Sequence, residues 1–470
     1  MVIPVRRPSA ETDSAGPQQH PGFVGWIVAA LRDLFPTVEP SRRRRRLSPS
    51  VTIILQVVAV AVGSVVMLLR VAGIPAWDGI YAEDYGVFFP QALEHPWHLL
   101  TPDGGYIELL PRLIAQFVTY LPLPYAAHAF ALIGAIISCL SALFIFHASA
   151  ALIRSPWLRG VLALSLLLLP VAPIEIVDSG VGSPWYLLIA LFFATLWRPK
   201  SRTGMAVVAI LAFMTAASTI LSVVLVPLLV ARAIALPRIR EHAVTAGWVA
   251  GTLVQVPYVI QSLSHKGSRG SRFAPFHQVV AFYGHDVLLP AFGWHLSWWL
   301  KSSVGVDGGM LLVGGLLAVV FAWAMITQDR RVRMFIGTAL LIGFVETVVA
   351  GTLTWWVSGN AVTHNFEPGS RYTDLPILLI DAALICAVDA YLRRTPVEMR
   401  GVAAVAALIA VLASGWVVDF RYVGNRSNST KWEPVAAASL AACRNHPDGA
   451  VTWHTGGGVV YQIPCDRLTR

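Results

Sequence analysis

The sequence predicts an all-α polytopic membrane protein. Of its 470 residues, 56% are hydrophobic and only 13% are charged, whereas an ordinary water-soluble domain carries about 25% charged residues. Apolar windows of roughly 18 residues or more recur within 51–418, and each is long enough to cross about 30 Å of hydrocarbon. The 16 Trp, 12 Tyr and 20 Phe residues can supply aromatic belts at both interfaces. These features exclude a disordered chain, a collagen-like fibre, a coiled coil and a soluble Rossmann or TIM-type enzyme.

The basic residues predict the orientation of the chain. The net charge of +9 comes from clusters that lie between apolar segments, so the positive-inside rule explains them and no nucleic-acid partner is expected. The cluster 42–46 directly precedes the apolar run 51–74, which predicts a cytoplasmic N-terminus. Further basic turns are expected on the same side, at Arg154/Arg159, Arg198/Lys200/Arg202, Arg232/Arg238/Arg240, Arg330/Arg331/Arg333 and Arg393/Arg394/Arg400.

Because the chain must cross and return between successive basic turns, we expect about 11 transmembrane helices and an exocytoplasmic C-terminus. The expected segments are 51–74, 125–149, 159–173, 185–197, 204–218, 219–231, 243–262, 309–327, 334–353, 373–391 and 402–418. The stretch 203–230 is ambiguous, since Thr215, Ser218, Thr219 and Ser222 interrupt it. It predicts either two short helices or one long helix with a re-entrant piece.

Three regions follow from this topology. Residues 1–50 are expected to be a partly disordered cytoplasmic segment without a removable signal peptide, whose apolar patch at 23–35 is at most a surface helix. Residues 51–418 are expected to form the transmembrane domain, with outer loops at 75–124, 174–184, 263–308 and 354–372. Residues 419–470 form an exocytoplasmic tail, in which alternating residues around 450–463 and the turn at 456–458 predict a small β-containing cap.

The cysteines separate into two pairs. Cys139 and Cys386 lie inside expected spans, where isolated thiols are small packing residues. Cys443 and Cys465 lie in the tail, in a compartment in which a disulfide persists. We therefore predict a bond between Cys443 and Cys465.

The first outer loop concentrates acidic residues after the first span. Glu83 and Asp84 should be held at the membrane interface by the aromatic residues that flank them, namely Trp77, Tyr81, Tyr85, Phe88 and Phe89. A carboxylate in that place is suited to take a proton from an acceptor hydroxyl. Glu94 and Asp103 are interpreted as solvated surface residues.

Two other outer loops carry basic residues where the positive-inside rule does not place them. They include Lys266, Arg269, Arg272 and Lys301 in one loop and His364 and Arg371 in the other. Arginine on an outer face favours an anionic ligand such as a phosphate, although Lys266 and Arg269 are equally well explained as solvated charges. The loop histidines lack metal-site spacing, so no zinc site is expected at His265, His277, His285 and His295.

Acidic residues at an outer rim and basic residues on facing loops are typical of an enzyme that acts on a lipid-linked phosphate. The motifs that carry this pattern are AEDYGVF, GGYIELLPRL, PIEIVDSGVGSPWYLL, ASTILSVVLVPLL and GSRYTDLP. Together they resemble bacterial glycosyltransferases of the GT-C fold, and the resemblance covers most of 51–418.

The resemblance implies a multi-pass glycosyltransferase of the inner (plasma) membrane with an exocytoplasmic active site. Its donor would be a polyprenyl-monophosphate sugar whose lipid tail lies in a groove between helices. Its acceptor would be a cell-envelope glycan or glycolipid, and transfer would invert the anomeric carbon. The implied base is Asp84 or Glu83; many relatives have two adjacent aspartates or Asp-Glu here, so the order Glu-Asp leaves the choice open.

The resemblance also implies roles for other residues. Arg371 and Tyr372 would bind the donor phosphate, with Arg272 and Lys266 as further phosphate contacts. Trp185 would line the sugar pocket. Glu175 and Asp178 are implied hydroxyl partners, and the remaining substrate-binding candidates are Asp78, Tyr85, Arg112 and His364.

Arg112 has alternative interpretations, because it could orient a carboxylate, touch a headgroup or snorkel to the interface. No cofactor is expected, because a monophosphate leaving group paired with Arg requires no metal. A divalent ion at Glu83 and Asp84 stays an alternative.

Other functions compete with the transferase. A transporter or flippase of lipid-linked sugars should have charged residues at mid-membrane and paired broken helices, whereas Glu346, Asp381 and Asp389 are isolated in sequence. A polysaccharide polymerase or ligase should rely on Arg and His in outer loops without the acidic motif. A non-enzymatic envelope scaffold has no need to concentrate both charges in its outer loops.

Overall fold

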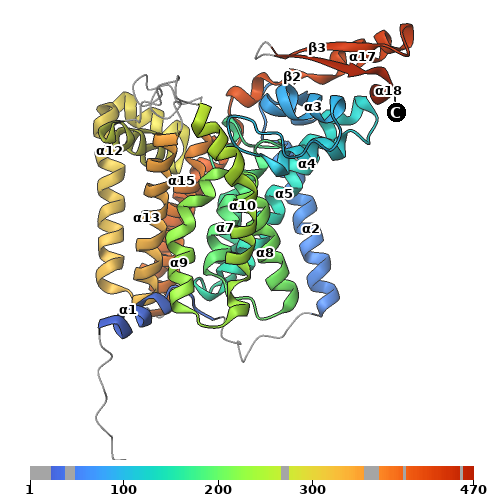
Figure 1. Cartoon of the computed structure of the whole chain (residues 1–470). Helices are drawn as coiled ribbons and strands as arrows, with labels where there is room; N and C mark the ends of the chain where they lie inside the picture. Colours follow the sequence, from blue (N-terminus) through green and yellow to red (C-terminus); the bar gives the residue numbers. More distant parts are fainter. Residues whose placement is uncertain are drawn as a thin grey trace, which may run out of the picture.

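The computed structural model describes residues 23–37, 48–265, 275–353, 370–394, 399–455 and 459–469. Within these ranges the protein is mostly helical. The long helices run side by side as a bundle, and a small cap that contains two strands lies at one end (Figure 1).

Eight helical segments in the described ranges are long and apolar enough to cross a membrane. They contain α2 (Pro49–Leu68), α5 (Ala126–Ala148), α6 (Pro156–Leu167), α10 (Ala243–His265), α12 (Trp294–Thr327), α13 (Arg330–Leu353), α15 (Asp374–Arg394) and α16 (Met399–Val418). This composition and architecture are those of an all-α, multi-pass membrane protein.

Three of the expected spans fall on shorter apolar helices. Segment 185–197 corresponds to α7 (Ser183–Leu196), segment 204–218 to α8 (Arg202–Ala216), and segment 219–231 to η6 (Ile220–Leu225) followed by α9 (Val226–Ala235). The ambiguous stretch therefore forms two helical pieces. Thr219 separates them, and its hydroxyl accepts a hydrogen bond from the N–H of Leu221 (3.3 Å). Length and composition assign eight crossings, and the total of about 11 stays a prediction.

Helices α7 and α15 form the centre of the bundle. Almost every residue of α7 and most residues of α15 are buried, as expected for helices that are apolar on all sides. By contrast, α2 leaves most of its Val, Ile and Leu side chains exposed. In a membrane protein such a surface faces lipid.

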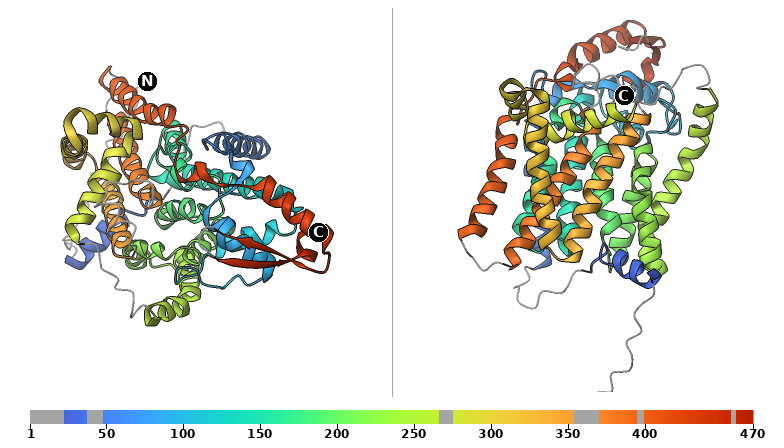
Figure 2. Two further views of the ribbon diagram at one scale, coloured as in Figure 1. Left: turned by 90° about the horizontal axis from the view of Figure 1, so that it is seen from above. Right: turned by 90° about the vertical axis from the view of Figure 1, so that its left-hand side faces the viewer.

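The two ends of the bundle differ in charge. Basic turns gather at the end opposite the cap, where Arg232 Nη1 donates to the carbonyl oxygens of Thr195 (2.6 Å) and Trp197 (2.9 Å). The apolar patch at 23–35 contains a short helix, α1 (Phe23–Arg32), which lies across this end (Figures 1 and 2). The expectation of a surface helix there agrees with this position.

The cap is a helix packed on a hairpin. It consists of α17 (Trp432–Asn445), the antiparallel strands β3 (Ala450–His454) and β4 (Val460–Pro464), and α18 (Cys465–Leu468). The expected disulfide is present between Cys443 and Cys465 and joins α17 to α18. The turn at 456–458 lies outside the described residues.

The cap is attached to the first outer loop. Strand β1 (Gly79–Ile80) pairs with β2 (Thr430–Lys431), and β4 packs on α3 (Phe89–Glu94). Phe89, Trp432 and Trp453 form an aromatic cluster with ring centroids 5.6–6.1 Å apart. From above, the cap extends sideways over this loop (Figure 2).

Candidate functional site

The acidic pair follows a reversal of the chain at the cap end of the bundle. After β1, Ala82 adopts a left-handed backbone conformation with a φ of 44°. Glu83 and the π-helical turn η2 (Asp84–Phe88) come next. Such a conformation costs of order 1–3 kcal/mol for a residue other than glycine and is concentrated at functional sites.

Asp84 is enclosed by the second outer turn. Its side chain has no exposed surface, and its Oδ2 accepts hydrogen bonds from the N–H groups of Gly180 (2.7 Å) and Val181 (3.2 Å). Oδ1 has no hydrogen-bond partner among the described residues. Burial raises the pKa of Asp84 to about 7, against the opposing effect of the two backbone hydrogen bonds.

The enclosure of Asp84 corrects one expectation. We expected this carboxylate at the interface within reach of a substrate, whereas it faces the turn that contains Gly180. A Cβ at Gly180 would lie 2.7 Å from Asp84 Oδ1, so only glycine allows this approach. The paired N–H donors of the turn explain why the carboxylate points inward.

Arg371 joins the two outer loops to the start of α15. Its Nη1 lies 3.7 Å from Glu83 Oε1, and its Nε lies 3.7 Å from Glu175 Oε2. Glu175 Oε2 also accepts hydrogen bonds from the backbone N–H of Arg371 (3.0 Å) and from the hydroxyl of Ser370 (3.1 Å). The side chain of Glu83 is 32% exposed and that of Glu175 only 8%. One guanidinium is thus held between a half-buried and a buried carboxylate.

Aromatic side chains border the Arg371 cluster. Trp185, in the first turn of α7, meets Tyr372 edge to face with ring centroids 5.2 Å apart. The Arg371 guanidinium lies over the Tyr372 ring at 5.8 Å from its centroid. Tyr81 and Tyr106 have raised pKa values, chiefly because of burial, and nearby carboxylates add to the effect. Their phenols therefore stay neutral and can donate hydrogen bonds.

Glu108 belongs to the same electrostatic environment, and sequence reasoning missed it. It precedes α4 (Leu109–Val118), and its Oε1 lies at hydrogen-bond distance from Tyr106 Oη (3.5 Å). Burial raises its pKa to about 8, and the charges of Glu83 and Asp103 contribute. The available signal was a lone glutamate directly before the apolar run of GGYIELLPRL.

Arg112 does not snorkel to the surface. It is 4% exposed, its Nη1 donates to Gln91 Oε1 (2.7 Å), and its guanidinium lies 5.2 Å from the centre of the Phe88 ring. The charges of Glu108 and Asp103 act on Arg112 electrostatically. Its contacts therefore support the packing of α4 against η2 and α3.

Asp178 is buried in the second outer turn. It is 1% exposed, and its backbone has a left-handed φ of 53°. Its carbonyl accepts a hydrogen bond from Arg426 Nη2 (2.9 Å). Burial raises the pKa of its carboxyl to about 7, while the charges of Arg426 and Arg70 oppose the shift. The hydrogen bond from Arg426 therefore joins the turn at Asp178 to the C-terminal segment.

The remaining candidates are distributed around the cluster. Asp78 is exposed at the end of η1 (Ala76–Asp78), and Tyr85 Oη lies 3.5 Å from the carbonyl oxygen of His454 in the cap. Lys266, Arg272 and His364 lie outside the described residues. The structure thus brings together Glu83, Asp84, Glu175, Trp185, Arg371 and Tyr372.

An apolar groove opens beside this region. It has a volume of about 200 Å³ and lies between η6 and α10, where it is lined mainly by Ile220, Val223, Trp248, Val256 and Ile260. Gln255 also lines it and makes two hydrogen bonds with the backbone of Ile107 (2.7 and 2.8 Å), next to Glu108. The groove therefore reaches the loop that carries part of the site.

No group of three or more His, Cys, Asp or Glu side chains in the described part of the chain is arranged to hold a metal ion. No protein-family model matches the sequence, and no curated protein matches it significantly. The functional assignment therefore depends on the geometry of the site.

Proposed function

We propose that the protein is an integral membrane glycosyltransferase of the GT-C type. It transfers a sugar from a polyprenyl-monophosphate donor to a cell-envelope glycan or glycolipid. It acts at the exocytoplasmic face of the inner membrane, and its N-terminus is cytoplasmic. The observation that carries the proposal is the position of Arg371 between Glu83 and Glu175 at the cap end of the bundle.

Arg371 is the proposed ligand of the donor phosphate. Its guanidinium is already balanced by two carboxylates, so an incoming phosphate competes with Glu83 and Glu175 for the same donors. When the bond between the anomeric carbon and the phosphate oxygen breaks, the phosphate leaves with the electron pair. Arg371 stabilises the charge that develops on it.

Glu83 is the proposed base. The acceptor hydroxyl attacks the anomeric carbon and gives its proton to the carboxylate, which requires a group that substrate can reach. Glu83 is partly exposed, whereas Asp84 is completely buried and bonded to the backbone of Gly180 and Val181. We therefore assign Asp84 to positioning: it fixes the acidic loop against the second outer turn.

Other groups near Arg371 are proposed to bind the sugar and the polyprenyl tail of the donor. The proposed sugar site lies beside Trp185 and Tyr372, which pack edge to face and are 8% and 9% exposed, and Glu175 offers a hydrogen-bond acceptor. The apolar groove beside Gln255 accommodates part of the polyprenyl tail. The donor thus approaches from the membrane, and the acceptor approaches from the cap side.

The second candidate function is transport or flipping of a lipid-linked sugar. It is favoured by carboxyl groups inside the spans: Glu346 in α13 has no exposed surface, and Asp381 in α15 is 2% exposed. In the described ranges neither carboxyl oxygen of Glu346 has a hydrogen-bond partner. Buried ionisable groups of this kind mark ion or substrate pathways in transporters.

The test measures transfer of radiolabelled sugar from a panel of polyprenyl-phosphate sugars to envelope glycolipid in membranes. We expect Glu83→Gln to lower the rate about 10²–10⁴-fold at unchanged protein level. Glu433→Gln, the same change at an exposed cap residue, is the matched control and should transfer at the wild-type rate. If the wild type consumes no donor, or if Glu83→Gln equals the control, the transferase proposal fails and lipid flipping is measured next.

A further inference from the structure

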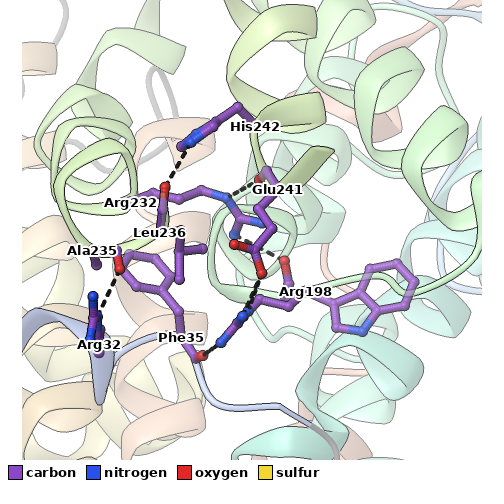
Figure 3. Close-up of polar contacts among 9 residues, drawn as sticks. Arg32, Phe35, Arg198, Arg232, Ala235, Leu236, Glu241 and His242 are labelled. Carbon is purple, nitrogen blue, oxygen red and sulfur yellow. Dashed lines mark hydrogen bonds and ion pairs between the residues drawn. The ribbon is translucent and has the colours of Figure 1, made fainter. Parts of the chain in front are cut away.

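Helix α1 is fastened to the end of the bundle opposite the proposed active site (Figure 3). Arg32 Nε donates to the carbonyl oxygen of Ala235 (3.1 Å), and Arg198 Nη1 donates to that of Phe35 (3.3 Å). Phe35 is completely buried, and the Arg232 guanidinium lies 5.7 Å from the centre of its ring. These contacts hold the segment after α1 in a defined position, so it can form the wall of a cavity.

A polar cavity lies between this segment and the turn that joins α12 to α13. Its volume is about 310 Å³, and the charged residues that line it are Arg154, Arg330, Arg331, Arg393, Asp33 and Asp329. Asp33 lies 3.4 Å from Arg330 and 4.0 Å from Arg331, and Asp389 lies 3.4 Å from Arg393. Among the described residues Arg154 has no ion-pair partner. The arginines therefore exceed the carboxylates that face them.

An apolar cleft adjoins the polar cavity. It has a volume of about 610 Å³ and is lined by Ala30, Met325, Met334, Gly337, Thr338 and Leu341, with Arg330 and Arg333 among its lining residues. Arg330 lines both cavities. Leu341 is 60% exposed and the nearby Ile326 is 80% exposed, which in a bundle of membrane-spanning helices is a lipid-facing surface.

We infer that these two cavities form one binding site for an anionic phospholipid. An acyl chain occupies the cleft beside α12 and α13. The lipid phosphate binds Arg330, which lines both cavities, together with Arg333 of the cleft and Arg331 of the polar cavity. Arginine suits this role because its guanidinium pairs with phosphate in a fork-like geometry and is weakly hydrated. Basic pockets between helices at a membrane interface bind anionic headgroups in this way.

The two halves of the site select the class of ligand. A free phosphate would leave the apolar cleft without an occupant. A zwitterionic headgroup would bring a cation toward the arginines, which opposes binding. The bound lipid connects α1 to the α12–α13 turn, so it should stabilise the folded protein. The site lies at the end opposite Arg371 and is therefore distinct from the proposed donor site.

The experiment uses the purified full-length protein in a neutral detergent, after delipidation. Native mass spectrometry and thermal unfolding are measured with phosphatidylglycerol, phosphatidylcholine or inorganic phosphate. We expect retained phosphatidylglycerol and a raised unfolding temperature with that lipid alone. An equal shift with phosphatidylcholine would overturn charge recognition, and a full shift with inorganic phosphate would overturn the lipid assignment.

Two variants locate the site. Arg331→Gln with Arg333→Gln should weaken phosphatidylglycerol binding about 30-fold. Arg202→Gln with Arg240→Gln, which removes two exposed arginines outside both cavities, should leave binding unchanged. Equal weakening in both double variants would show only a diffuse charge effect and would refute the site.

The cleft is tested without any change of charge. A Cβ at Gly337 meets no other atom within 4 Å, so Gly337→Leu should fill the cleft while α13 remains folded. We expect this variant to lose phosphatidylglycerol and its stabilisation. Unchanged binding by Gly337→Leu would contradict the proposed place of the acyl chain.

Discussion

Arg371 Nη1 lies 3.7 Å from Glu83 Oε1, although Glu83 follows the first long helix, α2, and Arg371 directly precedes α15. This contact lies at the cap end of the bundle, next in sequence to the buried carboxylate of Asp84. Because Glu175 binds the opposite side of the same guanidinium, the three charges form one unit.

Removal of Arg371 should lower both the stability of the protein and its affinity for the donor. Arg371→Gln leaves the carboxylates of Glu83 and Glu175 without their cation, which should cost about 1–3 kcal/mol of unfolding free energy. We also expect the KM for the polyprenyl-phosphate donor to rise at least about tenfold. Thermal unfolding and initial rates measure the two effects.

A second substitution distinguishes the two roles of Arg371. Glu175→Gln added to Arg371→Gln removes the remaining like-charge repulsion, so the unfolding temperature should recover. Activity should stay low, because Arg371, the proposed ligand of the donor phosphate, is still absent. Recovery of donor affinity in the double variant would contradict a role for Arg371 in phosphate binding.

Asp84→Asn should change the pH dependence of stability. Burial raises the pKa of Asp84 to about 7 from its ordinary value of 3.8. An acid with a raised folded-state pKa contributes stability that is fully present below its ordinary pKa and is lost as the pH rises through about 7. Thermal unfolding at pH 5 and pH 8 should therefore show Asp84→Asn gaining on the wild type as the pH rises.

The same substitution at exposed Asp448 is the control for the pH experiment. Other buried carboxyls, such as Glu108 and Asp178, titrate in both proteins, so they cancel in the difference between variant and wild type. If Asp84→Asn instead lost stability relative to the wild type as the pH rises, Asp84 would have a lowered pKa in the folded protein and the prediction would be wrong.

Gly180→Ala should disturb the acidic loop. Its new methyl group would lie 2.7 Å from Asp84 Oδ1 and 3.3 Å from Asp84 Cγ, and overpacking of this kind costs about 1–3 kcal/mol. The unfolding temperature and the transfer rate should both fall. Gly160→Ala in α6 is the matched control, because its Cβ meets nothing within 4 Å and alanine favours the helix. Equal behaviour of the two variants would remove the case for a tight contact at Gly180.

The orientation of the protein in the membrane can be tested with single-cysteine variants. Their background carries Cys443→Ser and Cys465→Ser, so it has no disulfide in the cap. Glu433→Cys lies in the cap, and Arg240→Cys lies among the basic turns at the other end; both positions are exposed. A membrane-impermeant maleimide on intact cells should label only Glu433→Cys, because basic turns stay in the cytoplasm. Cys139 and Cys386 are buried and should not react. The reverse labelling would invert the proposed topology.

Hydropathy and charge patterns predicted the long apolar helices because these patterns are local. They did not predict α11 (Phe276–Phe282) or the first part of α12, which lie within the expected outer loop 263–308. Each expected span falls on a helix. The break near Thr219 separates two helical pieces, which was one of the two alternatives expected for 203–230. The contacts within the site were less predictable. The residues flanking Asp84 indicated an interfacial carboxylate, and nothing local to them shows that the turn at Gly180 donates two N–H groups to it.

The membrane class, the long helices and the cysteine pair of the tail follow from local patterns in the amino-acid sequence, because apolar length, charge spacing and compartment are properties of short stretches of chain. The sharing of Arg371 by Glu83 and Glu175, and the position of Glu108 in the same environment, follow from packing in three dimensions. The same packing encloses a basic cavity between the segment after α1 and the α12–α13 turn. These relationships depend on the packing of helices that are distant in sequence, where a shift of one turn would place different side chains in contact.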